Sequence, residues 1–139
     1  MIRITSFILS DGIINAPDQN GNVNQLLAKP TMLLKLQFIP SALSFCFALG
    51  VAGIDITKDG NKLKLTVMDP DENEVFTPGE MNIPVDAAAE SMPVEQRGCL
   101  ICMDMRNVAF RMEGVFHLRV EVNGEFIGNC EIPVYLCEK

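Results

Sequence analysis

The stretch FHLRVEVNGEFIGNCEIPVYL, Phe116–Leu136, decides the fold class. Apolar and polar residues alternate as far as Val122, which is typical of a strand with one buried and one solvent-facing side. Asn123-Gly124 follows directly, and both residues tolerate the positive φ that a two-residue hairpin turn requires. The alternation then resumes towards the end of the stretch. We therefore predict an antiparallel hairpin here.

Upstream of this hairpin the same alternation recurs in several short segments. It predicts further strands over residues 2–9, 32–38, 45–49, 62–67, 75–83 and 101–110. The strand over 45–49 is the most apolar and is expected to be central. Between Met105 and Val108 the alternation changes phase, which predicts a bulge or bend.

Helix is restricted to one short segment. Asp86 can cap a turn within Val85–Glu90, and prolines on both sides limit its length. The segment APDQNGNVN, Ala16–Asn24, is interpreted as a polar loop. The pattern predicts an all-β fold, an antiparallel β-sandwich of about eight strands, immunoglobulin-like or similar, as a single domain over residues 1–139.

Composition narrows the range of functions. The chain has 139 residues, 48% of them hydrophobic, so it can bury a core and is not expected to be disordered. Its net charge of −7 argues against a nucleic-acid-binding surface and favours a protein partner with a basic face. The longest apolar run, Ala42–Ile54, is too short for a membrane span. With five cysteines, an odd number, we expect reduced thiols and a cytoplasmic location.

An acidic stretch after residue 68 resembles a calcium-binding loop in its spacing. Asp69, Asp71, Asn73 and Glu80 fall at loop positions one, three, five and twelve of an EF-hand. However, the sixth position holds Glu74 instead of glycine, two prolines interrupt the loop, and strands flank it. A turn between two strands explains the same residues. We therefore predict a turn and no metal between Asp69 and Glu80.

The cysteines form one close pair, Cys99 and Cys102, in a CxxC arrangement. On a strand, residues three positions apart point to opposite faces, so these thiols cannot converge on one metal ion. No second pair with zinc-knuckle spacing is present, and no helix follows that would lower a thiol pKa. We interpret the cysteines as small core residues and predict no cofactor.

Catalytic motifs are sparse. The sequence has no GxSxG, P-loop or GxGxxG pattern. Its single histidine, His117, lies on the solvent-facing side of its predicted strand. A Cys-His pair with Cys99 or Cys130 is the one nucleophilic arrangement that the residues allow. We predict that the chain is not an enzyme.

Two segments carry a resemblance to a known family. FRMEGVFHLRVEVNGEFIGNCEIPVYL (110–136) resembles the closing hairpin, and LSFCFALGVAGIDITKDGNKLKLTVMDPDENEV (43–75) the central strands, of an uncharacterised family of small bacterial and phage β-sandwich proteins. The resemblance implies a sandwich fold and no catalytic residues. It also implies that some relatives are encoded by phages.

Two functions follow from these observations. The first is a non-enzymatic β-sandwich that binds a protein. The alternative is a small acidic inhibitor, encoded by a phage or mobile element, that occupies the basic cleft of a host nucleic-acid-binding defence enzyme. Neither the partner nor the oligomeric state follows from the sequence. The candidate binding residues are the charges of the acidic turn and of the solvent-facing strand side: Asp69, Asp71, Glu72, Glu74, His117, Arg119 and Glu121.

Overall fold

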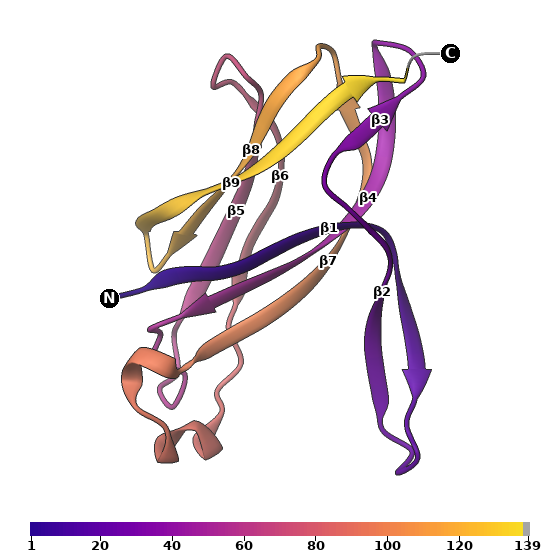
Figure 1. Cartoon of the computed structure of the whole chain (residues 1–139). Helices are drawn as coiled ribbons and strands as arrows, with labels where there is room; N and C mark the ends of the chain where they lie inside the picture. Colours follow the sequence, from indigo (N-terminus) through magenta and orange to yellow (C-terminus); the bar gives the residue numbers. More distant parts are fainter. Residues whose placement is uncertain (138–139) are drawn as a thin grey trace.

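The computed structural model describes residues 1–137, which form nine strands and two short 3-10 turns (Figure 1). The strands are β1 (Arg3–Pro17), β2 (Val23–Thr31), β3 (Leu34–Leu36), β4 (Ser41–Ala52), β5 (Lys62–Met68), β6 (Glu74–Asn82), β7 (Gly98–Phe110), β8 (Gly114–Val122) and β9 (Glu125–Leu136). The 3-10 turns are η1 (Ala87–Ser91) and η2 (Val94–Gln96). The all-β prediction is confirmed.

The strands make two sheets that enclose one apolar core. The first sheet has the order β2-β1-β4-β7, and the second has the order β3-β9-β8-β5-β6. Neighbouring strands are antiparallel except for β3 and β9, which run parallel. The core contains side chains from both sheets, among them Phe47 of β4 and Leu118 of β8. The predicted sandwich therefore forms, with one parallel pair at an edge.

The hairpin of β8 and β9 forms as predicted. Asn123 and Gly124 have φ angles of 52° and 80°, and Val122 pairs with Glu125 across the turn. The Asn123 side chain also accepts a hydrogen bond from the Lys62 N–H at 2.8 Å. The turn residue thus fixes the hairpin against the neighbouring strand β5.

Three phenylalanines join the two sheets at one end of the core. The ring centroids of Phe45 and Phe110 are 6.1 Å apart, and those of Phe110 and Phe116 are 5.1 Å apart in an edge-to-face arrangement. Each such pair contributes about 0.5–1.5 kcal/mol beyond the area that it buries.

The phase change predicted in the 101–110 strand is a bulge in the pairing of β4 with β7. The register slips between Leu43 and Phe45, and Asn107 opposite them takes a φ of 54°. The Asn107 N–H donates to the Ser44 hydroxyl at 3.1 Å, so the bulged residue keeps a hydrogen-bond partner.

The segment between β6 and β7 is ordered by an arginine. Asp86 caps η1 by accepting from the Ala88 N–H, as predicted. The Arg97 guanidinium donates to the carbonyls of Ala89 and Met92 and to the Asp55 carboxylate, at 2.9–3.0 Å.

Among the described residues, no helix has the length and apolar character needed to cross a bilayer.

The N-terminal region differs from the prediction. The first strand extends past Leu9 to Pro17, and the loop predicted over Ala16–Asn24 is a shorter, tight turn at 18–22, with two strand residues on each side of it. The strand β2 was not predicted at all. It faces solvent on both sides, so its sequence carries no alternation between buried and exposed residues.

The prediction of a strand over residues 32–38 is only partly correct. Leu34 and Leu36 are buried on β3, whereas Met32 and Phe38 are exposed beyond its ends. Alternation alone cannot show where a strand ends, because that depends on how far the pairing partner β9 extends.

Candidate functional site

The acidic stretch is a turn between β5 and β6. The Asp69 carboxylate accepts hydrogen bonds from the backbone N–H groups of Asp71 and Asn73, at 2.9 and 2.8 Å. The Asp69 N–H in turn donates to the Asn73 carbonyl at 2.8 Å, which closes the loop. Glu72 adopts a left-handed φ of 66°. The residues with calcium-like spacing therefore form the predicted turn, in which the first carboxylate, that of Asp69, binds backbone N–H groups.

A second turn with the same construction joins β1 and β2. Asp18 accepts from the N–H groups of Asn20 and Asn22, at 2.8 and 2.9 Å, and Gly21 takes the left-handed position with a φ of 82°. Both turns have the pattern Asp-x-x-x-Asn. The fourth residue is glycine in one turn and Glu72 in the other. The repeated Asp-x-x-x-Asn pattern is the signal in the sequence that indicates the turn between β1 and β2.

The predicted face of β8 lies on the outer side of the second sheet. His117, Arg119 and Glu121 are partly exposed, while the residues between them are buried. The Arg119 guanidinium lies over the Phe126 ring, 4.5 Å from its centroid, and its Nε donates to Glu121 at 3.4 Å. The ring holds the arginine along the sheet surface.

The structure brings part of the two predicted groups together. Glu72 of the acidic turn lines a hollow of about 290 Å³ together with His117, Arg119, Met68 and Asn129. His117 is opposite Met68 in the strand register, so the turn that follows Met68 lies beside the end of this face. The exposed faces of β8 and the acidic turn thus form one surface, which we call the acidic face.

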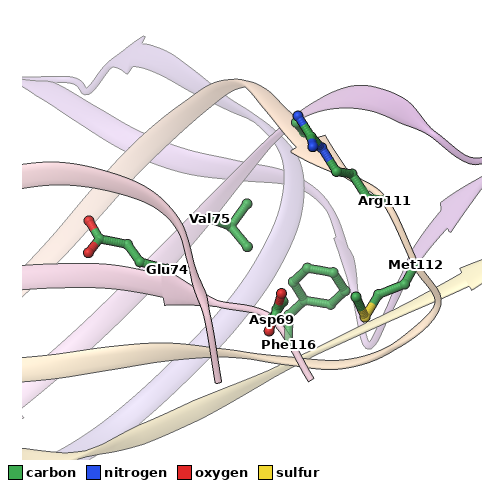
Figure 2. Close-up of a pocket in the computed structure, with 7 residues that line it drawn as sticks. Asp69, Glu74, Val75, Arg111, Met112 and Phe116 are labelled. Carbon is green, nitrogen blue, oxygen red and sulfur yellow. The ribbon is translucent and has the colours of Figure 1, made fainter. Parts of the chain in front are cut away.

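Other turn residues point to a different cavity. Asp69 and Glu74 line a space of about 350 Å³ with Arg111, Met112 and Phe116 (Figure 2). Asp71 lines neither cavity and is exposed. The acidic turn therefore has two sides, and only one of them belongs to the acidic face.

The structure places Cys99 and Cys130, the two candidate partners of the histidine, away from His117. Cys130 is opposite Leu118 in the register and is buried, whereas the neighbouring His117 faces outward, so the two lie on opposite sides of the sheet. Burial raises the pKa of the Cys130 thiol to about 11. Burial also raises the pKa of Cys99, which lies in the other sheet. Protonated thiols are poor nucleophiles at neutral pH.

The two cysteines of the CxxC pair point away from each other. Cys99 and Cys102 are opposite Val51 and Ala48 on β4, three positions apart, and so face opposite sides of the strand. Within residues 1–137, no group of three or more histidine, cysteine, aspartate or glutamate side chains is placed to hold a metal ion.

The sequence pattern does not predict one further feature, a hairpin that extends away from the sandwich. The outer half of β1 and β2 pair from Gly12–Ala28 to Pro17–Val23, and this hairpin extends away from the rest of the ribbon in Figure 1. We call residues 12–28 the arm. No residue from 11 to 31 is buried. Asp18, in the turn, is the only charged residue of the arm.

The arm exposes apolar side chains, and two large ones lie side by side on one face. Ile14 and Leu26 are directly opposite each other in the register, and each is about half exposed, at 52% and 51%. Their neighbours on the same face include Gly12, Ala16 and Ala28, which are small and uncharged. The signal for this feature in the sequence is a run without charges, not a periodic pattern.

The opposite side of the sandwich is also incompletely covered. β6 pairs only with β5, and β7 pairs only with β4, so each has a free edge. We call the region between β6 and β7 the seam. The partly buried apolar residues of β6, of β7 and of the segment just after β7 pack against the core: Val75, Phe76, Met81, Cys99, Ile101, Met103 and Met112. The 350 Å³ cavity lies at one end of the seam, and a cavity of about 400 Å³ lies at the other, beside Ile83 and Leu100.

Comparison with known proteins adds a family and no activity. No curated protein matches the chain. Residues 8–135 match the model of a family of unknown function, DUF6941. This agrees with the resemblance to an uncharacterised family that segments 43–75 and 110–136 indicate. Because the match covers nearly the whole sequence, the chain belongs to this family of unknown function.

Proposed function

We propose that the chain is a non-enzymatic, protein-binding β-sandwich and that the arm is the part that binds. The observation that carries this proposal is the exposed apolar face of the arm around Ile14 and Leu26. A two-stranded hairpin with no packing beneath it is only marginally stable in water. A partner that covers this face supplies the missing packing.

Covering this face makes a measurable contribution to the free energy of binding. Burying a large aliphatic side chain completely contributes about 1.5–3 kcal/mol. Ile14 and Leu26 are each half exposed, so covering both contributes about 2 kcal/mol, or roughly a 30-fold gain in affinity. Backbone pairing along the free edge of β2 adds to this in the manner of strand addition.

The test is co-purification from the native host. An Ile14→Thr/Leu26→Thr variant keeps strand propensity but removes the two exposed aliphatic side chains of this face. We expect the amount of partner recovered with this variant to fall at least about tenfold. Its melting temperature should stay the same, because both side chains are about half exposed.

The matched control is Phe38→Thr, which removes an exposed apolar side chain outside the arm. This control is expected to retain the partner. Equal recovery of all proteins with wild type, arm variant and control would refute the proposal.

A second candidate function is favoured by the acidic face. Glu72 lies at the hollow with His117 and Arg119, and Glu131 is opposite His117 on β9. Negative charge at this surface suits an inhibitor that occupies a basic cleft, and association would then slow as salt screens the attraction. Replacing Glu72 and Glu131, the carboxylates beside His117 on this face, by glutamine should slow association with the captured partner. An unchanged rate would exclude this face and leave the arm.

A further inference from the structure

We propose that the partner of the arm is a second copy of this chain: β2 of one copy pairs with the free edge of β7 in the next. The inference rests on the proposed function and names its partner. The two strands lie at opposite ends of the same sheet, in the order β2-β1-β4-β7. Pairing between copies therefore continues one sheet from molecule to molecule.

One part of each free edge lacks the usual protection against such pairing. Native proteins block exposed strand edges with charged residues, prolines or bulges. The run Val23–Ala28 of β2 and the run Gly98–Met103 of β7 contain no charged residue. The two runs are equally long, because Lys29, with a φ of 52°, ends the regular part of β2, and Asp104 begins the charged part of β7.

The side chains beside these edges also match. Leu100 of β7 is 69% exposed, and the 400 Å³ cavity beside it is lined by Ile56, Met81 and Ile83. The arm carries the exposed side chain of Leu26, an apolar projection. An apolar projection on one surface and an apolar hollow on the other favour β2 on β7 over either strand pairing with itself.

The arrangement has a consequence for assembly. The two surfaces differ, so the contact is heterologous, and it leaves one free arm and one free seam after each addition. Copies would therefore add head to tail, into a ring if the rotation closes and into a filament if it does not.

The test uses the full chain and two lysine variants at exposed positions, Leu26→Lys on the arm and Leu100→Lys on β7. A charge on an edge strand opposes pairing. By sedimentation velocity, the wild type should form species larger than the 15.3 kDa monomer as concentration rises. Each variant alone should remain a monomer. Circular dichroism and melting temperature check that both variants fold as the wild type does.

Mixing the variants gives the decisive result. The intact arm of Leu100→Lys and the intact β7 of Leu26→Lys can form one contact and no more, so an equimolar mixture should stop at a dimer. Self-association of Leu26→Lys alone would show that two β7 edges pair, and self-association of Leu100→Lys alone would show that two β2 edges pair. Either outcome overturns the proposal.

The experiment separates this inference from the proposed function. A wild-type chain that stays monomeric, but whose co-purifying partner is lost in Leu26→Lys, overturns self-assembly and leaves the arm as a binding element for another protein. A monomeric chain whose captured proteins do not depend on the arm overturns both. Assembly that Leu26→Lys does not reduce removes the arm from the contact.

Discussion

Replacing Glu72 by glycine should stabilise the protein, although glycine usually destabilises a fold. Glu72 has a φ of 66°, in the left-handed region, where a side chain costs roughly 1–2 kcal/mol. Glycine removes that cost but adds about 0.5–1 kcal/mol of backbone entropy in the unfolded chain. The net gain is about 0.5–1 kcal/mol. Gly21, with a φ of 82°, occupies the same position in the turn between β1 and β2 and shows that glycine fits it.

The other interactions of the turn should survive this change. The hydrogen bonds that close it come from the backbone N–H groups of Asp71 and Asn73 to the Asp69 carboxylate. Within residues 1–137, the Glu72 side chain makes no hydrogen bond or ion pair that would be lost. The substitution therefore tests backbone strain with little other disturbance.

The assay is reversible thermal unfolding followed by circular dichroism. For a domain of this size, about 1 kcal/mol corresponds to roughly 4 °C, so Glu72→Gly should raise the melting temperature by about 2–4 °C. The control is Glu72→Ala, which removes the carboxylate but keeps a Cβ in the left-handed region. It should change stability by less than about 0.5 kcal/mol. Asn, which tolerates this region, should fall between them. Equal stability of the glycine and alanine variants would refute the reasoning.

Two further predictions concern stability. Gly98→Ala should lower the melting temperature strongly, because the alanine Cβ would lie 1.9 Å from the Val51 carbonyl oxygen. The matched control is Gly12→Ala, whose Cβ would have no atom within 4 Å. Similar melting temperatures for the two variants would contradict this reasoning. Hydrogen bonds from Thr57 hold the pKa of the Asp55 carboxyl below the usual aspartate value. The ionised form is therefore favoured by folding, and this stability is present above pH 3.8 and lost as the pH falls below it. Asp55→Asn should then be less stable than wild type at pH 7, with a difference that shrinks in urea titrations below pH 3.8.

The buried half of the fold could be predicted because burial leaves a pattern in the sequence. Leu63, Leu65 and Val67 alternate with polar residues because one side of β5 faces the core. The turn Asn123-Gly124 could be predicted because few residue types accept positive φ. The bulge near Asn107 shifted the alternation of β7 and could be detected for the same reason.

The arm could not be predicted in this way. β2 has no buried face, so solvent does not impose a period on its residues, and only its pairing with β1 makes it a strand. The exposure of Ile14 and Leu26 likewise depends on the absence of packing beneath the arm, which no local pattern records. In the candidate surface, the sequence identified Glu72 and His117 separately, and the register of β5 with β8 placed them at one hollow.

The sequence by itself determined the fold class, the closing hairpin and the acidic turn, because each depends on residues that are neighbours along the chain. The tertiary structure alone decided which strand edges are free, where the arm projects, and that Cys130 and His117 face opposite sides of one sheet. These properties depend on which distant segments pair. Backbone hydrogen bonds between strands are nearly independent of side-chain identity, so the sequence does not state the pairing directly.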